Sequence, residues 1–338
     1  MSKIIGGEFN IPISEMKTNI NNRKNSGNYF SSGRSAFCAI LRNISFDEPR
    51  KVLLPDYLCS SITKVCIDEN IQYHFYHINE DLFPDEKSLF EELGDNTIVL
   101  LISYFGIIDN TPVIEKIKNQ KPGSIIILDD VQNFYANESV NSSWDYRFTS
   151  YRKWFSVPDG AEVFCKNSVL QFFDKGNLFA EYKFAGNLLK NYSDWIGDDF
   201  CLDLIEQGEK ILDSNYNCVC SSISRQLIPQ ISYDKIKGVR KENAQFLHNE
   251  LDKLGIRHLY STNTVPLFVP IFFNKRDKIR NNMFENNIFT PIHWPYESKE
   301  LNGLKMNTIY NYELSLICDQ RYSLEDMEKQ IGVLKKCI

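Results

Sequence analysis

The chain has 338 residues, of which 43% are hydrophobic and 13% aromatic, so it can bury a large core and a mainly disordered state is excluded. Its formal net charge of -6 argues against a broad phosphate-binding surface, and nucleic acid is not an expected partner. The nine cysteines are scattered without a CxxC pair, and no secretory leader is expected, so we predict reduced thiols in a cytoplasmic protein. The longest apolar run, residues 98–108, is shorter than the ~20 residues that cross a bilayer, and no membrane partner is expected.

Short apolar runs alternate with helical patterns over roughly the first half of the chain. A turn of small residues at 32–36 precedes a helical run at 37–41. Strands that alternate with helices are typical of parallel sheets, so we predict an α/β fold with a central, mostly parallel sheet. Ligands in such folds bind at the carboxyl ends of the strands. The predicted strands are residues 52–54, 73–77, 98–103, 125–129 and 163–165.

The second half of the chain begins with helical patterns and ends with mixed ones. Residues 178–212 are predicted to be mostly helical, and residues 239–254 form a long amphipathic helix. After Gly255 the pattern indicates a small α+β domain. We therefore predict a large domain over residues 1–220, whose N-terminal segment can pack on the other domain, and a small C-terminal domain over 221–338. Within the latter we expect strands at 265–273 and 314–318 and helices at 277–285 and 323–334.

Two motifs in the first half of the chain carry groups suited to coenzyme chemistry. A buried strand ends in paired acids, in the run Ile125-Ile126-Ile127-Leu128-Asp129-Asp130-Val131-Gln132. The later run Ser150-Tyr151-Arg152-Lys153-Trp154 continues to Pro158-Asp159-Gly160, a turn sequence that can fix a loop. Pyridoxal phosphate (PLP) needs an amine for its Schiff base and an acid that keeps its ring nitrogen protonated. Asp130 competes with Asp129 for the second role, and either acid can instead cap a following helix.

These residues, in this order, resemble the DegT/StrS sugar aminotransferases, a branch of the fold type I PLP enzymes, and the resemblance covers most of the chain. It implies that Lys153 binds the coenzyme and that Asp129 pairs with the pyridine nitrogen. Gln132, three residues later, would approach the ring hydroxyl. Ser150 would contact the coenzyme phosphate through a Ser-x-x-Lys spacing that is shorter than the commonest family pattern.

Two further coenzyme contacts follow from the resemblance. Gly33, Arg34 and Ser35 stand where the family has its phosphate cup, and a small-residue turn at a helix N-terminus offers backbone N–H groups to an anion. Tyr57 follows the strand at 52–54 and would stack on the coenzyme ring, because the usual position of the stacking aromatic holds Cys59 here. The alternative is that Tyr57 is a packed core tyrosine.

Two C-terminal segments also resemble parts of the family near its active-site entrance. In His293-Trp294-Pro295, His293 would lie beside the sugar, with a packed histidine as the alternative. In Asp319-Gln320-Arg321-Tyr322, Arg321 would meet a carboxylate or a diphosphate, with an ion pair to Asp319 as the alternative. No metal site is predicted, because none of the five histidines has a ligand partner at a useful spacing.

The resemblance implies a PLP-dependent aminotransferase that moves an amino group from glutamate to a nucleotide-linked keto sugar, in the synthesis of a surface polysaccharide or glycan. It also implies a homodimer. One alternative is another fold type I activity, such as a lyase or a desulfurase, although no cysteine lies in a convincing Gly/Ser-rich lid. The other is a catalytically silent relative that binds sugar nucleotides. The presence of Lys153 and Asp129 argues against it, and the missing stacking aromatic argues for it.

Overall fold

The computed structural model describes residues 3–11, 27–44, 51–136, 143–165, 170, 176–296 and 306–338. The chain divides into two compact units. The first unit comprises Met1–Gly7, Pro49–Trp144 and Tyr233–Ile338, and the second comprises Glu8–Glu48 and Asp145–Ser232. The expected boundary between a large and a small domain near residue 220 stays a prediction.

The first unit contains a four-stranded parallel sheet in the order β4-β3-β5-β6. Strands β3 and β5 are buried along their whole length and β6 along most of it, as expected for a parallel sheet covered on both faces, whereas the edge strand β4 is only partly buried. The pairs Pro55 with Tyr76 and Ile102 with Asp129 place the carboxyl ends of neighbouring strands at one edge. These elements confirm the predicted α/β fold class. Their bounds are β3 (Val52–Pro55), α2 (Ser60–Asp68), β4 (Tyr73–Tyr76), α3 (Glu86–Glu92), β5 (Ile98–Ile102), η2 (Tyr104–Gly106), α4 (Thr111–Gln120) and β6 (Ile125–Asp129).

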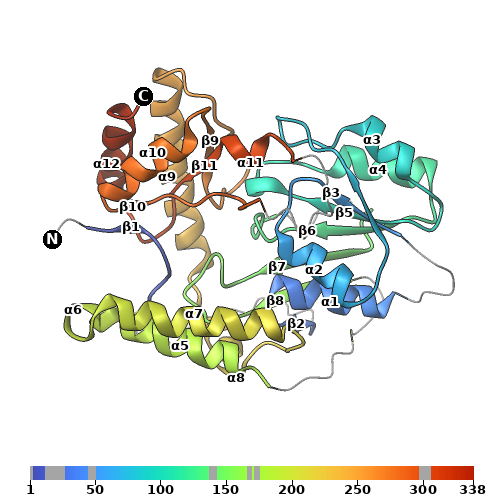
Figure 1. The fold of residues 1–338 in the computed structure, drawn as a ribbon, viewed down its shortest axis with the longest axis horizontal. Coiled ribbons are helices and arrows are strands. Elements are labelled where there is room, and N and C mark those ends of the chain that lie inside the picture. The colour runs from blue at the N-terminus through green and yellow to red at the C-terminus, as the bar shows by residue number, and fades with distance from the viewer. Residues whose placement is uncertain are drawn as a thin grey trace. The chain divides into compact units, whose positions relative to one another are not determined.

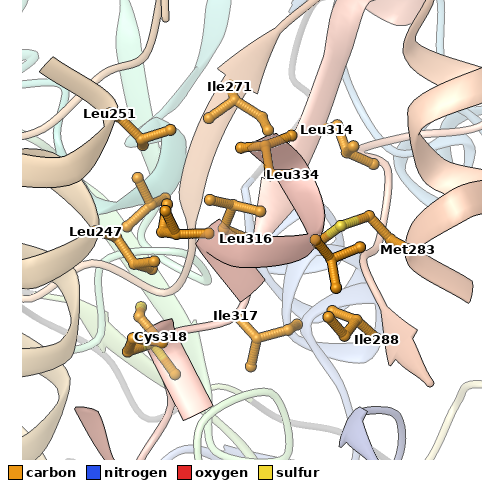
Figure 2. Close-up of a cluster of buried hydrophobic side chains, with 14 of the residues drawn as sticks. Leu247, Leu251, Ile271, Met283, Ile288, Leu314, Leu316, Ile317, Cys318 and Leu334 are labelled. Atoms are coloured by element: carbon orange, nitrogen blue, oxygen red, sulfur yellow. The ribbon is translucent and has the colours of Figure 1, made fainter. Parts of the chain in front are cut away.

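The C-terminal part of the first unit is an α+β arrangement around a second hydrophobic core. Strand β9 (Val269–Phe272) pairs antiparallel with β11 (Glu313–Leu316), and α9 (Tyr233–Lys253), α10 (Arg276–Glu285) and α12 (Leu324–Lys335) pack around them (Figure 1). Figure 2 shows Leu247 and Leu251 of α9 directed toward Ile271 and Leu316 of the two strands. The short α11 (Ile309–Tyr312) precedes β11.

The N-terminal segment joins this part of the first unit. Strand β1 (Ile5–Gly6) pairs parallel with β10 (Ile288–Phe289), and the Gly6 N–H donates to the Tyr322 hydroxyl at 2.8 Å. Helix α12 begins with a capping box, in which Ser323 and Asp326 exchange side-chain and backbone hydrogen bonds. Ile5 and Gly6 are therefore fixed by residues from the C-terminal part of the chain.

The second unit combines three antiparallel strands with a group of helices. The strand order is β2-β8-β7, and α1 (Gly33–Asn43) packs on β7 and β8. Helices α5 (Leu178–Leu189) and α7 (Asp198–Ser214) lie side by side (Figure 1). Strand β7 was not predicted. The remaining bounds are β2 (Tyr29–Phe30), β7 (Tyr146–Ser150), β8 (Ala161–Cys165), η3 (Lys190–Tyr192), α6 (Ser193–Ile196), α8 (Ser222–Leu227) and η4 (Ile228–Gln230).

Two further findings concern the whole set of described residues. Within it, no helix has the length and apolar character that a membrane span requires. All nine cysteines fall inside the described ranges, and each is a free thiol.

Candidate active site

Asp129 lies at the carboxyl edge of the parallel sheet in the first unit. It is the last residue of β6, it is buried, and its Oδ1 accepts the backbone N–H of Val131 at 2.9 Å. The Asp129 carbonyl accepts the N–H of Ser103 at 3.0 Å, which ties the ends of β5 and β6 together. Asp130 is buried as well. Residues 131–136 form turns, so neither acid caps a helix within this stretch.

Gln132 uses its two polar side-chain atoms differently. Its Oε1 accepts the backbone N–H of Phe105 at 2.7 Å, whereas its Nε2 is buried and has no hydrogen-bond partner in the described part of the chain. A buried donor without a partner costs about 1–3 kcal/mol. An oxygen acceptor on a ligand, such as the ring hydroxyl of PLP, would remove this cost. The side chain therefore fits the role that the resemblance gives it.

The Gln132 side chain is held by a tight turn that follows β5. In this turn Phe105 has a φ of +56° and Gly106 a φ of +73°. A Cβ atom at Gly106 would lie 2.8 Å from the Gln132 carbonyl oxygen, so no other residue fits without displacing the backbone. No motif predicted from the sequence includes this turn. Its signal was a Ser-Tyr-Phe-Gly run directly after a buried strand.

Tyr57 is fully buried within an aromatic cluster. Its ring centroid lies 5.5 Å from that of Tyr104, 5.3 Å from that of Trp294 and 4.9 Å from that of Tyr310. Burial, and then the charge of Glu313, raise the pKa of the Tyr57 phenol well above its ordinary value. This is the environment of a packed core tyrosine, the alternative to a ring that stacks on the coenzyme. The Tyr57 hydroxyl has no hydrogen-bond partner among the described residues.

Residues from far along the chain complete this edge of the sheet, and the sequence analysis missed them. Asn307 Nδ2 donates to Asp56 Oδ1 at 2.7 Å, and His77 Nδ1 lies 2.7 Å from Asp56 Oδ2. The Tyr310 hydroxyl accepts the Leu58 N–H and donates to the Leu58 carbonyl, both at 2.9 Å. The loop after β3 is thus fixed by side chains that immediately precede β11.

His293 is largely buried and shares a neighbour with Gln132. Its side chain is 11% exposed, and its ring lies edge-on to Phe105 with centroids 5.6 Å apart. Its backbone N–H donates to Glu313 Oε2 at 2.6 Å, and its Nδ1 lies 3.2 Å from Ser315 Oγ. Phe105 therefore contacts both residues, because its backbone N–H bonds Gln132 and its ring packs against His293.

Arg321 forms the ion pair that was its alternative interpretation. Its Nε and Nη2 atoms bond Asp319 Oδ1 and Oδ2 at 2.9 and 2.8 Å, and its Nη1 donates to the Gly7 carbonyl at 3.1 Å. Burial alone would raise the pKa of the Asp319 carboxyl, but the hydrogen bonds and charge of Arg321 hold it below its ordinary value. The predicted contact of Arg321 with a substrate anion stays a prediction.

Lys153 lies in the second unit, in a connection between β7 and β8 that we call the lysine turn, residues 150–160. The N–H groups of Trp154 and Phe155 bond the Tyr151 carbonyl at 3.0 and 2.9 Å and close a helical turn around Lys153. Tyr151, Trp154 and Phe155 are buried, whereas Lys153 is half-buried. The Tyr151 hydroxyl donates to the buried Glu162 carboxylate at 2.6 Å. Three large side chains thus anchor the turn that carries the lysine.

The predicted Pro-Asp-Gly turn fixes the other end of the lysine turn. The fully buried Asp159 accepts the Ser221 N–H at 2.8 Å, the Ser221 hydroxyl at 2.6 Å and Asn177 Nδ2 at 2.6 Å. Burial raises the pKa of this carboxyl, while these hydrogen bonds act in the opposite direction. Ser150 is buried, and its hydroxyl lies 3.4 Å from the Gly160 carbonyl.

Charges beside Lys153 are paired across the second unit. Arg152 Nη1 and Lys183 Nζ both bond Glu209 Oε1, at 2.7 and 2.9 Å. Burial of Glu209 would raise the pKa of its carboxyl, but the charges of Arg152 and then Lys183 lower it to about 2. The Arg152 side chain, next to Lys153, is thereby held by Glu209 on α7.

The predicted phosphate cup is the N-terminus of α1. Ser32 caps this helix by accepting the Ser35 N–H at 3.1 Å, and the first intrahelical bond runs from Ala36 to the Ser32 carbonyl. The Ser35 hydroxyl donates to the Tyr216 carbonyl, and Arg34 Nη1 bonds Asp213 at 2.8 Å. The side chains of Arg34 and Ser35 are therefore engaged within the unit. The backbone N–H groups of the first turn are the groups that suit an anion.

Comparisons with known proteins agree with this architecture. No family model matches the sequence, and no curated protein matches it. Among solved structures, a putative sugar aminotransferase of Streptococcus pneumoniae is similar with a TM-score of 0.71 and 13% identity, over 98% of this chain and 96% of that one. It was also solved in PLP and PMP forms.

Two further structures extend the comparison. Helicobacter pylori PseC, an aminotransferase of pseudoaminic acid biosynthesis, has a TM-score of 0.68 and 13% identity over 99% of both chains. A DegT/DnrJ/EryC1/StrS aminotransferase of Brucella abortus has a TM-score of 0.61 and 13% identity over 91% of this chain and 84% of that one. The chain therefore has the fold of the fold type I sugar aminotransferases. The suspected resemblance is confirmed at the level of the fold.

Proposed function

We propose that the protein is a PLP-dependent aminotransferase that transfers an amino group, from glutamate, to a nucleotide-linked keto sugar. The observation that carries the proposal is the arrangement after β6. There, Asp129 is fixed at the strand end, and Gln132 keeps a buried amide donor without a partner in the described part of the chain. The shared fold supports the same conclusion, because PLP and PMP forms are known for a protein of this fold.

The chain's own residues would hold and use the coenzyme as follows. The Asp129 carboxylate keeps a proton on the ring nitrogen, and the Gln132 amide donates to the ring hydroxyl. The backbone N–H groups at Gly33 and Arg34, with the helix dipole, bind the phosphate. When bound, PLP supplies a carbonyl for the amine and a protonated ring that accepts electrons. Lys153 would hold the coenzyme through its amine. Once the amine of the amino donor has displaced it, the freed Lys153 amine would take the proton from the Cα atom of the donor and deliver it to the coenzyme carbon.

The sugar substrate and its pathway are the finer part of the proposal. The neighbours named above include aminotransferases that act on sugars, and they support a keto sugar as the amino acceptor. We place the reaction in the cytoplasm, in the synthesis of a surface polysaccharide or glycan. His293 would lie beside the sugar, and its position against Phe105, whose N–H holds Gln132, supports this role.

We also propose a homodimer. The second unit exposes several large hydrophobic side chains on its helices, among them Leu178 at 57%, Trp195 at 86% and Phe200 at 54%. Side chains of this size and exposure are candidates for burial in a subunit interface. Light scattering at micromolar concentration should give twice the mass of the chain. A monomer that binds PLP and turns over would contradict the proposal.

Two measurements test the function itself. Purified protein should show the near-violet absorption of bound PLP. Borohydride reduction should then fix the coenzyme covalently to the wild type, whereas the reduced coenzyme should be lost from denatured Lys153→Ala. A panel of nucleotide-linked keto sugars, supplied with glutamate, should then yield 2-oxoglutarate with at least one of them. Absence of coenzyme binding would favour the silent relative, and bound coenzyme without 2-oxoglutarate for any sugar would favour another fold type I activity.

A further inference from the structure

A separate cluster of titratable side chains lies in the first unit at the end of α9. It consists of His248 and Asp252 on the helix and His258 in the segment that follows. One ligand atom from each residue lies within 4.8 Å of the other two. Neither the coenzyme residues nor the proposed function uses this cluster.

The termination of α9 brings the three residues together. Gly255 has a φ of +63°, its N–H bonds the Asp252 carbonyl at 3.0 Å, and the Ile256 N–H bonds the Leu251 carbonyl at 3.1 Å. This pair of bonds is a Schellman motif, which reverses the chain direction. His258 therefore returns to the helix face that carries His248 and Asp252, which are neighbours at i and i+4. The sequence spacing alone does not reveal this return, which is why no metal site was predicted.

The segment after the turn is held in place by strand β9. The Leu259 N–H bonds the Pro270 carbonyl at 3.2 Å, and the Phe272 N–H bonds the Arg257 carbonyl at 3.1 Å. His258 lies between these two bonds, and its side chain is 7% exposed. Its ring is therefore a fixed element, whereas the Asp252 side chain is 62% exposed and free to adjust.

The His248 and His258 rings each direct one nitrogen atom toward the other ring. His258 Nδ1 lies 2.8 Å from the Ile256 carbonyl, so Nδ1 carries the proton and Nε2 presents a lone pair. His248 Nδ1 lies 2.7 Å from that Nε2, and the His248 ring stacks on Tyr260 with centroids 4.5 Å apart. A backbone carbonyl that orients the distal nitrogen is the arrangement that metal-bound histidines usually have.

We propose that His248, Asp252 and His258 bind a divalent transition-metal ion of the Zn²⁺ class. Ligand atoms in a tetrahedral site with bonds of about 2.0–2.2 Å are about 3.3 Å apart. The separations from His258 Nε2, 2.7 Å to His248 Nδ1 and 3.7 Å to Asp252 Oδ1, bracket this value. Two imidazoles and one carboxylate favour Zn²⁺, Ni²⁺ or Cu²⁺ over Mg²⁺ and Ca²⁺, which prefer oxygen ligands. Solvent completes the coordination on the exposed side of Asp252.

A metal ion here would connect the last turn of α9 to the segment that pairs with β9. Because an ion that binds only the folded state stabilises it, Zn²⁺ should raise the thermal midpoint of the protein. The ion takes no part in the proposed amino transfer, so this inference stands or falls independently of it.

The chain offers a sharp test because it has only five histidines. Full-length protein without an affinity tag is labelled with ¹⁵N-histidine and titrated with Zn²⁺ alone. We expect the ring signals of His248 and His258 to shift and those of His74, His77 and His293 to stay. Mg²⁺ at the same concentration should shift none of them.

Calorimetric titration of variants with Zn²⁺ measures how much each ligand contributes to the affinity. His248→Ala and Asp252→Asn should each weaken Zn²⁺ binding. Loss of an outer-sphere partner typically lowers metal affinity by about 10–100-fold, and loss of the His248 ligand should lower it by more than that. The control is His74→Ala, because the His74 ring lies 3.1 Å from the carboxylate of Glu92 and provides a histidine–carboxylate pair on the same unit. The thermal midpoint of each metal-free variant verifies that it folds.

Three results would overturn the proposal. The first is Zn²⁺ affinity in His248→Ala equal to that of the wild type. The second is a set of shifted signals that belongs to the other three histidines. The third concerns protein in which Co²⁺ replaces Zn²⁺ as a spectroscopic probe. Intense near-ultraviolet absorption typical of thiolate ligands would place the ion on cysteines.

Discussion

The two regions that carry the predicted coenzyme residues differ in how their polar groups are satisfied. At the carboxyl edge of the first unit's sheet, the Gln132 amide and the Tyr57 hydroxyl are buried without hydrogen-bond partners in the described part of the chain. In the lysine turn, the Asp159 carboxylate accepts three hydrogen bonds from other segments. Unpaired buried groups are costly, so the first region retains atoms that a ligand can satisfy. The second is a scaffold that positions one amine.

The strongest test of the lysine turn is removal of its amine. Lys153→Ala should abolish transamination and leave the fold intact, because the buried anchors Tyr151, Trp154 and Phe155 are unchanged. Activity and circular dichroism measure the two effects. Lys210→Ala is the control, since Lys210 is an exposed lysine that pairs with Glu206 on α7. Mass spectrometry after borohydride reduction should locate a phosphopyridoxyl group on Lys153, and its presence on another lysine would refute the assignment.

The neighbouring acids of the first region provide a matched pair. Asp129→Ala should lower kcat by at least about 100-fold, the typical cost of removing a preorganised group that stabilises developing charge. Asp130→Ala should retain far more activity. Steady-state kinetics of both variants decide between the two positions. If Asp130→Ala is the inactive variant, the assignment along β6 is displaced by one residue.

Gln132→Glu tests the buried Nε2 donor of Gln132, which has no hydrogen-bond partner among the described residues. The substitution keeps an oxygen that accepts the Phe105 N–H and replaces the amide donor by a second acceptor. We expect PLP affinity to fall by about tenfold or more, equivalent to about 1.4 kcal/mol. Fluorescence titration of the apoprotein measures it. Gln226→Glu, on the exposed surface of α8, is the control, and equal affinities in the two variants would show that Gln132 does not contact the coenzyme.

The smallest expected effect concerns the charges that support the lysine turn. The pKa of Glu209 is lowered to about 2, so its contribution to stability is present above the unfolded-state pKa of about 4.5 and is lost as the pH falls toward 2. Because the side chain is partly exposed and screened by water, we expect a contribution on the order of 1 kcal/mol. Urea unfolding of wild type and Glu209→Gln should differ above pH 5 and converge at lower pH. If the difference in unfolding free energy between wild type and Glu209→Gln does not change with pH, the effect comes from packing and not from charge. Glu206→Gln is the control.

Most elements of the fold were predictable because their patterns are local. The apolar runs that became β3, β5 and β6 and the amphipathic helix α9 follow from side-chain period alone. Strand β7 was missed because its sequence, Tyr-Arg-Phe-Thr-Ser, does not read as an apolar run. Its Arg147 is nevertheless buried, with the guanidinium 4.5 Å from the centroid of the Phe164 ring. A contact between a cation and an aromatic ring on a neighbouring strand gives no local sequence signal.

The candidate site was predictable where the motif is contiguous. The position of Asp129 at a strand end and the fixing of the lysine turn by Asp159 both follow from short runs of sequence. The environment of Tyr57 was not predictable, because Trp294 and Tyr310 reach it from more than 200 residues away. The Asp319–Arg321 ion pair, by contrast, is a local contact that the sequence offered as an alternative.

The hydroxyl of Tyr310 bonds both backbone groups of Leu58, a residue that lies 252 positions earlier. During synthesis the loop after β3 therefore leaves the ribosome long before the side chain that fixes it. At about 5–20 residues per second, this interval lasts roughly 10–50 s. For nearly all of it, Tyr57 has neither Tyr310 nor Trp294 to pack against. The nascent chain consequently presents an unfinished aromatic loop on its first sheet, which is the kind of surface that chaperones bind.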